Sequence, residues 1–116
     1  MAEKTYLAIP YTWNTEQSFK IANKVAADLM RQGFVVFSPI SHSHPIAHYL
    51  DVKLKYDQLF WMKQDLPILE ECDSIHLVVI NKEGEELISC SQGCQSELKR
   101  AKELNLPIIK YYYEDE

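Results

Sequence analysis

The chain has 116 residues, of which 47% are hydrophobic and 25% are charged, and its formal net charge at pH 7 is −5. This composition is typical of a single compact globular domain spanning residues 1–116, and it excludes disordered and fibrous classes. Because the acidic balance leaves no basic stripe, we expect no nucleic acid polymer and no anionic membrane as a partner, while a small anion held by local groups stays open.

The first half of the chain predicts two strands around one long helix. The apolar run TYLAIP at residues 5–10 predicts a buried strand that ends at a proline. Asn14 resembles the start of a capping box, apolar residues follow it at helical spacing, and Gly33 is a typical C-terminal stop. The run FVVFSP at 34–39 predicts the second strand. The segment SPISHSHPIAH at 38–48 predicts a polar loop.

The second half predicts two more helices and two more strands. A helix is expected over about residues 57–71, and because Pro67 lies inside it, we expect a kink or a break near Asp65. An apolar strand, an amphipathic helix and a last strand complete the chain, at SIHLVVI (74–80), SCSQGCQSELKRAKELNLP (89–107) and PIIKYYY (107–113).

The alternation of strands and helices predicts the fold class. Strands that are continuously apolar are buried on both faces, which is typical of a parallel sheet covered by helices on both sides. We therefore expect an α/β protein with a small flavodoxin-like or Rossmann-like three-layer fold and a parallel sheet of about four strands. Ligands of such folds bind beyond the carboxyl ends of the strands, where the strand order reverses. The segments that follow the first three strands, residues 11–12, 38–44 and 81–91, are expected to line one crevice there, with Tyr11 contacting the substrate.

The helix that starts near Ser91 points a carboxylate toward its own core. At about 100° per residue, Glu97 falls on the apolar side with Cys94 and Leu98. Helical side chains lean toward the N-terminus, so Glu97 would lie over Gly93, where no side chain blocks the space for a ligand. With Ser91 as N-cap, the free N–H groups behind it favour a phosphate or carboxylate. Desolvation would raise the pKa of Glu97, as in active sites. The alternative is a cap or an ion pair at the edge of the core.

Several motifs resemble the nucleoside 2-deoxyribosyltransferase superfamily, in the right order along the chain. The stretch SQGCQSELKRA is similar to the nucleophile helix of that superfamily, YLAIPY to its first strand, and DLPILEECD to the segment before its third strand. The stretch SPISHSHPIA, with the S-x-G-x-x-x-E helix, resembles an uncharacterised bacterial and phage subgroup. The resemblance covers most of the chain.

The resemblance implies a reaction and its catalytic residues. Glu97 matches the glutamate that attacks C1′ of a deoxyribosyl group, releases the base and forms a glycosyl-enzyme intermediate. Asp65 is the candidate for the second carboxyl, which supplies or orients the proton for the leaving group. Tyr6 matches a tyrosine near the nucleophile, and the hydroxyl of Ser91 matches a position that tolerates a 5′-phosphate, which a carboxylate would repel.

The implied function is that of an N-glycosidase or deoxyribosyltransferase acting on a nucleoside 5′-monophosphate or a related nucleotide. The alternative is a non-catalytic module that binds a nucleotide-derived ligand. We expect no cofactor and no metal ion. Superfamily members often complete a neighbour's site with C-terminal residues, so a homo-oligomer is expected.

Two segments near the crevice leave alternatives open. Ile9 stands where many superfamily members have glycine, which predicts a smaller or differently shaped pocket. On an extended 38–48 segment, His42 and His44 would alternate and, with Ser41, contact a phosphate or a leaving base. A solvated loop is the first alternative, and a metal site is the second, although no third ligand is evident at a recognisable spacing. Trp13 is a candidate for stacking on the base, with simple packing as the alternative.

The cysteines and the N-terminus indicate where the protein resides. Three cysteines are too few, and odd in number, for a secreted disulfide framework. The first residues, MAEKTYLAIPYTW, lack the apolar core of a signal peptide, and no run approaches the roughly 18 apolar residues of a membrane span. We therefore expect reduced thiols and a cytoplasmic protein.

Overall fold

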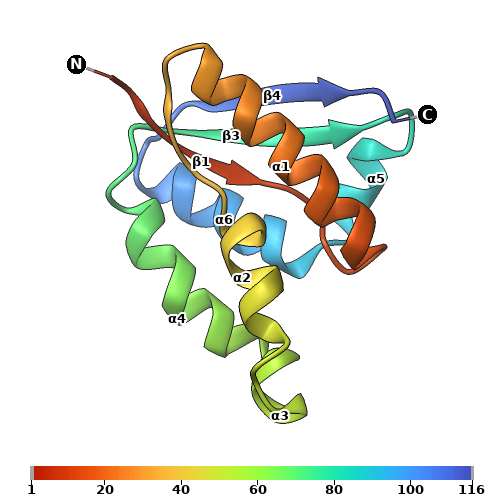
Figure 1. The fold of residues 1–116 in the computed structure, drawn as a ribbon. Coiled ribbons are helices and arrows are strands. Elements are labelled where there is room, and N and C mark those ends of the chain that lie inside the picture. Colours follow the sequence, from red (N-terminus) through yellow and green to blue (C-terminus); the bar gives the residue numbers. More distant parts are fainter. Residues whose placement is uncertain (1, 116) are drawn as a thin grey trace.

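The computed structural model describes residues 2–115 and contains within them a four-stranded parallel sheet (Figure 1). The strands are β1 (Lys4–Ala8), β2 (Val35–Phe37), β3 (Ser74–Ile80) and β4 (Ile108–Tyr113). Their order is β2-β1-β3-β4, so β2 and β3 lie on opposite sides of β1 and the strand order reverses between β1 and β3. The predicted α/β class, the flavodoxin-like arrangement and the parallel sheet are confirmed.

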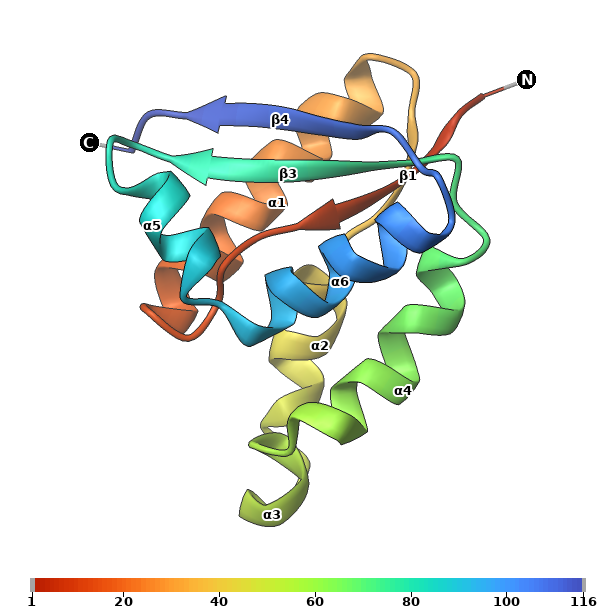
Figure 2. The same ribbon diagram turned by 180° about the vertical axis from the view of Figure 1, so that it is seen from behind.

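Helices cover both faces of this sheet (Figures 1 and 2). Within residues 2–115 the helices are α1 (Thr15–Arg31), α2 (Pro39–Ala47), α3 (Val52–Lys55), α4 (Gln58–Leu69), α5 (Gly84–Ser89) and α6 (Gln92–Glu103). Helix α1 packs on one face, and α4, α5 and α6 pack on the other. None of these helices is both long and apolar enough to cross a membrane.

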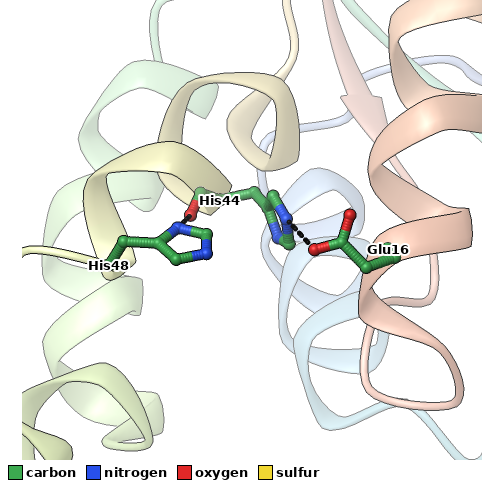
Figure 3. Close-up of side chains that lie close together, drawn as sticks. All are labelled: Glu16, His44 and His48. Carbon is green, nitrogen blue, oxygen red and sulfur yellow. Dashed lines mark hydrogen bonds and ion pairs between the residues drawn. The ribbon is translucent and has the colours of Figure 1, made fainter.

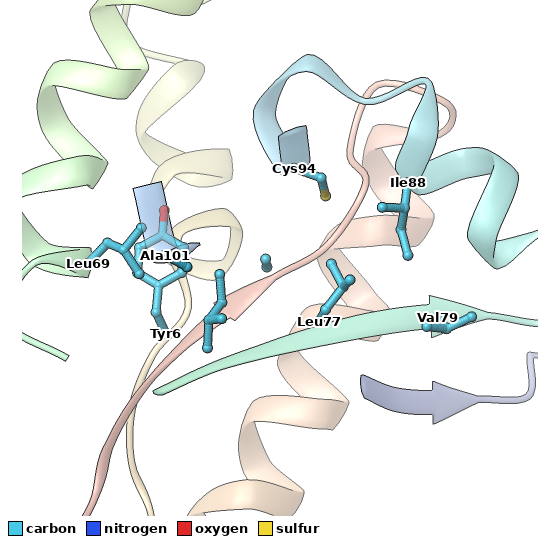
Figure 4. Packing of buried hydrophobic residues seen from close by; sticks show 9 residues of the cluster. Tyr6, Leu69, Leu77, Val79, Ile88, Cys94 and Ala101 are labelled. Carbon is cyan, nitrogen blue, oxygen red and sulfur yellow. The ribbon is translucent and has the colours of Figure 1, made fainter. Parts of the chain in front are cut away.

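Two apolar cores form because successive side chains of a strand point to opposite faces. Leu7 of β1 and Val78 of β3 face α1, where they meet residues such as Ile21. Tyr6 and Leu77 face the other way, into a core completed by α4, α5 and α6 (Figure 4). Tyr6 is fully buried. Tyr6 is buried because β1 is an inner strand of the sheet. Its hydroxyl points toward α6, where it reaches Glu97.

Residues 39–47 form helix α2, where a polar loop was expected. Ser38 is extended at the N-cap and Pro39 occupies the first turn, a position that suits the fixed φ of proline. The helix packs on α1, and the ring of His44 stacks on Phe19 with centroids 4.4 Å apart. These tertiary contacts stabilise a helix that the local sequence does not favour. The expectation that His42 and His44 alternate on an extended segment was therefore wrong.

Helix α4 continues through Pro67, where a kink or a break near Asp65 was expected. Pro67 lies in the last turn of α4, so the missing N–H costs a hydrogen bond only to the carbonyl of Lys63. Lys63 is exposed, and water can hydrate that carbonyl. The short helix α5 was not predicted. It begins at Gly84, where a Cβ would lie 2.4 Å from Cγ1 of Val79, so glycine lets α5 approach β3 closely.

Candidate active site

A cavity of about 490 Å³ opens beyond the carboxyl end of β1, beside the point where the strand order reverses. Its volume lies within the range of about 300 to 1,000 Å³ that is typical of small-molecule sites. The walls come from the segment after β1, the start of α1, helices α2 and α4, and the start of α6. They are formed by Leu7, Ile9, Tyr11, Thr12, Thr15, Glu16, Pro39, Ile40, Ser43, His44, Ala47, His48, Lys55, Tyr56, Gln58, Trp61, Met62, Asp65, Leu66, Cys90, Ser91, Gln92, Gly93 and Glu97.

The cavity brings together most of the residues singled out from the sequence. Glu97 and Asp65 both line it, and the hydroxyl of Tyr6 reaches Glu97 from the core behind the wall. Four of the predicted substrate-binding residues also line it, namely Tyr11, His44, Ser91 and Gly93. These residues come from β1 and its following segment and from α2, α4 and α6, so they meet only in the folded chain.

The structure places the other three predicted substrate-binding residues outside this cavity. Trp13 is 37% exposed and lines a smaller depression, and its indole N–H donates to the carbonyl of Pro10 at 2.9 Å. The Ser41 hydroxyl lies 2.7 Å from that of Ser38. His42 is exposed on the helix whose other residues line the cavity. None of the three lines the main cavity, and their contact with a substrate stays a prediction.

Glu97 is held by a neighbouring strand and by its own helix. Ser91 caps α6, since its Oγ accepts from the N–H of Cys94 at 3.2 Å. One turn further, the carboxyl oxygen Oε2 of Glu97 accepts a hydrogen bond from the Tyr6 hydroxyl. Burial raises the pKa of Glu97 to about 8, the bond from Tyr6 partly opposes this rise, and the charge of Asp65 adds to it.

Glu97, Asp65 and Tyr6 form a group of three acidic side chains, and their charges affect one another's pKa. Burial raises the pKa of Asp65 to about 6, against a smaller opposing effect of His42. Burial also raises the pKa of Tyr6 far above its usual range, and the charges of Glu97 and Asp65 act in the same direction. Tyr6 therefore stays protonated and remains a hydrogen-bond donor. Between about pH 6 and pH 8, Asp65 and Glu97 together hold one proton. Because the two carboxyls interact, this protonation is a property of the pair and not of either residue alone.

A second polar cluster lines the cavity, and sequence reasoning found only part of it. The Nδ1 atom of His44 lies 2.5 Å from the Tyr11 hydroxyl. Its Nε2 atom lies 3.0 Å from Oε1 of Glu16 (Figure 3). His48 lies four residues after His44, one helical turn away. Glu16 was missed because it comes from α1. His48 was missed because a spacing of four residues places two side chains together only on a helix.

Helix α4 presents further residues that the sequence reasoning did not assign to the site. Gln58, Trp61 and Met62 precede Asp65 at spacings of seven, four and three residues, so they share its helix face and line the cavity with it. Trp61 donates its indole N–H to the carbonyl of Lys55 at 2.9 Å. Helical spacing from Asp65 was the signal that would have found them.

Residues 3–113 match a family model whose description is "Domain of unknown function (DUF1937)". The chain belongs to the DUF1937 family. No match was found among curated proteins. Among solved structures, the DUF1937 chain is similar to a 2-deoxyribosyltransferase from the psychrotolerant bacterium Bacillus psychrosaccharolyticus, with a TM-score of 0.66 and 23% sequence identity. The match covers 97% of this chain and 74% of that one, and it establishes a shared fold.

Proposed function

We propose that this DUF1937 protein is an N-glycosidase or deoxyribosyltransferase that acts on a nucleoside 5′-monophosphate or a related nucleotide. The observation that carries the proposal is the Glu97 carboxyl group, which is desolvated beside Asp65 in a ligand-sized cavity and held by the Tyr6 hydroxyl. A surface that only binds a ligand does not require two desolvated carboxyls in one cavity. The shared fold with a 2-deoxyribosyltransferase supports the same function.

The proposed reaction uses both carboxyls in a retaining scheme. In the tautomer that carries the shared proton on Asp65, the ionised Glu97 attacks C1′ of the sugar, the N-glycosidic bond breaks, and its electron pair leaves with the base. Asp65 in its protonated form delivers a proton to that base. Water or a second base then attacks C1′ of the glycosyl ester, the ionised Asp65 takes the proton that the attacking group loses, and the Glu97 carboxylate is released. Tyr6 keeps Glu97 oriented throughout, because its donor is bonded to Oε2 and leaves Oε1 available for attack.

The start of α6 is the proposed seat of the 5′-phosphate. Ser91, Gln92 and Gly93 line the cavity at the first turn of α6, where backbone N–H groups and the helix dipole favour an anion. Ser91 adds a neutral hydroxyl. This position lies within the same cavity as Glu97, so one ligand can occupy both.

Replacing Ser91 with aspartate is expected to weaken binding of a nucleoside 5′-monophosphate by tenfold or more, while binding of the matching nucleoside changes little. Asp is as good an N-cap as Ser, so α6 is retained. Its charge, about 5 Å from a phosphate, would repel it by about 3 kcal/mol at an effective dielectric constant of about 20. Calorimetric titration with both ligands measures the difference. Ser91→Asn is the matched control, since it keeps the cap without the charge, and equal weakening by both variants would argue against a phosphate at this position.

The decisive experiment is a panel of ribo- and deoxynucleotides incubated with the purified protein and followed by chromatography. The proposal requires that at least one nucleotide releases free base or exchanges it. The non-catalytic binding module is the second candidate, and it would be favoured by tight binding of a nucleotide with no base release from any member of the panel.

A homo-oligomer also stays a prediction. The connection around α3 exposes several large apolar side chains on which a second copy would pack, namely Tyr49, Val52, Tyr56 and Leu59. We expect light scattering to give a mass above that of one 13.5 kDa chain. A Tyr49→Ser, Leu59→Ser double variant is expected to shift the mass toward the monomer. A monomeric mass for the unmodified protein would contradict the prediction.

A further inference from the structure

We propose that Glu16, His44 and His48 form a binding site for a divalent transition-metal ion such as Zn²⁺. Each of the three offers a ligand atom, and these atoms lie within 4.8 Å of one another (Figure 3). All three residues line the same cavity as Glu97. The inference rests on the geometry of this cluster and does not depend on the proposed glycosidic chemistry.

The fold positions the three ligands from two helices that pack together. His44 and His48 are separated by four residues on α2 and its C-cap, so their side chains lie on one helix face. Glu16 lies in the first turn of α1, and α1 packs against α2. The His44 ring is buried and stacked on Phe19, so its orientation is fixed by the core.

Hydrogen bonds set which nitrogen of His48 is available to a metal ion. The Nδ1 atom of His48 lies 3.1 Å from the backbone oxygen of His44. A carbonyl oxygen only accepts hydrogen bonds, so Nδ1 carries the ring proton and Nε2 keeps a free lone pair. Metal-binding histidines are commonly oriented in this way, by donating the second ring N–H to an oxygen outside the coordination shell.

His44 has the same kind of outer partner in Tyr11. Its Nδ1 atom lies 2.5 Å from the Tyr11 hydroxyl, while Nε2 lies 3.0 Å from Oε1 of Glu16. A bound metal ion would replace the proton that lies between Nε2 of His44 and the Glu16 carboxylate. The neutral His44 ring then carries its proton on Nδ1, and this N–H donates a hydrogen bond to the Tyr11 oxygen. The Tyr11 hydroxyl proton then turns away from the ring. No proton is gained or lost by this exchange of tautomers.

The distances and donor types indicate which ions fit. Zinc binds nitrogen and oxygen ligands at about 2.0 to 2.2 Å, so the ligand atoms of a tetrahedral centre lie about 3.4 Å apart. Glu16 and His44 already approach this spacing, and the remaining ligand atoms, which lie within 4.8 Å, need only a small shift of the exposed Glu16 and His48 side chains to reach it. Two imidazoles and one carboxylate suit Zn²⁺ and its transition-metal neighbours, whereas Mg²⁺ and Ca²⁺ prefer oxygen ligands. Three protein ligands leave a further position for a ligand oxygen.

The test is calorimetric titration of the metal-stripped, reduced full-length protein with Zn²⁺. We expect one equivalent to bind with a dissociation constant in the micromolar range or below, and Mg²⁺ not to compete. His48→Ala and Glu16→Gln are each expected to weaken Zn²⁺ binding by about 100-fold or more, and Tyr11→Phe by about 10- to 100-fold as an outer partner. Both ligand variants change exposed side chains, and circular dichroism checks that they fold.

Two controls separate this site from adventitious binding. His42→Ala removes another exposed histidine of α2 that lies outside the cluster, and Cys90→Ser removes an exposed thiol. Both are expected to keep the Zn²⁺ affinity. As a second readout, Co²⁺ should give a visible ligand-field absorption band that His48→Ala abolishes. The proposal is overturned if millimolar Zn²⁺ does not bind, or if Zn²⁺ binds equally well to the Glu16→Gln and His48→Ala variants.

Discussion

Replacing Glu97 with glutamine is expected to abolish base release and to leave ligand affinity nearly unchanged. The amide has the shape of the carboxyl group and its oxygen still accepts a hydrogen bond from Tyr6, so the cavity keeps its form. The amide cannot attack C1′, and loss of a covalent nucleophile costs about 10⁴-fold or more in turnover. Chromatography of the free base measures the reaction, and equilibrium titration with the same nucleotide measures the affinity.

The matched control for this substitution is Glu103→Gln on the same helix. Glu103 is exposed and pairs with Arg100, away from the cavity, so the control removes one negative charge from α6 without touching the site. We expect its turnover to equal that of the unmodified protein. Base release by Glu97→Gln at a rate close to that of this control would remove Glu97 from the proposed reaction.

The same substitution is expected to stabilise the protein at alkaline pH. The pKa of Glu97 is raised from 4.5 to about 8 by folding, so the folded state binds this proton more tightly than the unfolded state. Between about pH 4.5 and pH 8, unfolding therefore releases a proton, and the free energy of unfolding falls as the pH rises. Each pKa unit corresponds to about 1.4 kcal/mol, so the penalty reaches several kcal/mol above pH 8. Asp65, raised from 3.8 to about 6, acts in the same direction over a lower pH range.

Denaturant unfolding at several pH values measures this effect. Glutamine does not ionise, so Glu97→Gln should unfold at a higher denaturant concentration than the unmodified protein at pH 8.5. The difference should shrink on acidification and vanish near pH 4, where Glu97 is protonated in both states. A difference that is the same at every pH would mean that burial of the ionised carboxyl does not cause it. Glu103→Gln should show no comparable gain at pH 8.5.

The sequence predicted the sheet and the long helices because their signals are local. The four apolar runs became strands, Asn14 caps α1 by accepting from the N–H of Gln17 at 3.1 Å, and Ser91 caps α6 in the same manner. The inward position of Glu97 followed from helical periodicity alone. Its proximity to Asp65 and Tyr6 followed from the family resemblance, since no local pattern connects residues so far apart in the chain.

Helix α2 and its partners escaped prediction because tertiary contacts determine them. The segment around Pro45 has weak helical signals, and its helix is stabilised by packing on α1. Once it was read as a loop, the relation between His44 and His48 was hidden. Glu16 joins them from a different helix, 28 residues before His44, and only the packing of α1 on α2 brings it there.

Because Tyr6 is buried in the core, the position of Glu97 in the cavity is fixed, whereas other parts of the cavity wall can vary in sequence. The side chain that orients Glu97 belongs to the middle of the sheet, so the reacting group cannot be displaced without disturbing the core around Leu69 and Leu77. Other side chains of α2 and α4 that line the cavity, such as Ala47 and Met62, are only partly buried and belong to neither core. Changes of substrate preference within the family would therefore accumulate on those two helices, while the attacking carboxyl stays where it is.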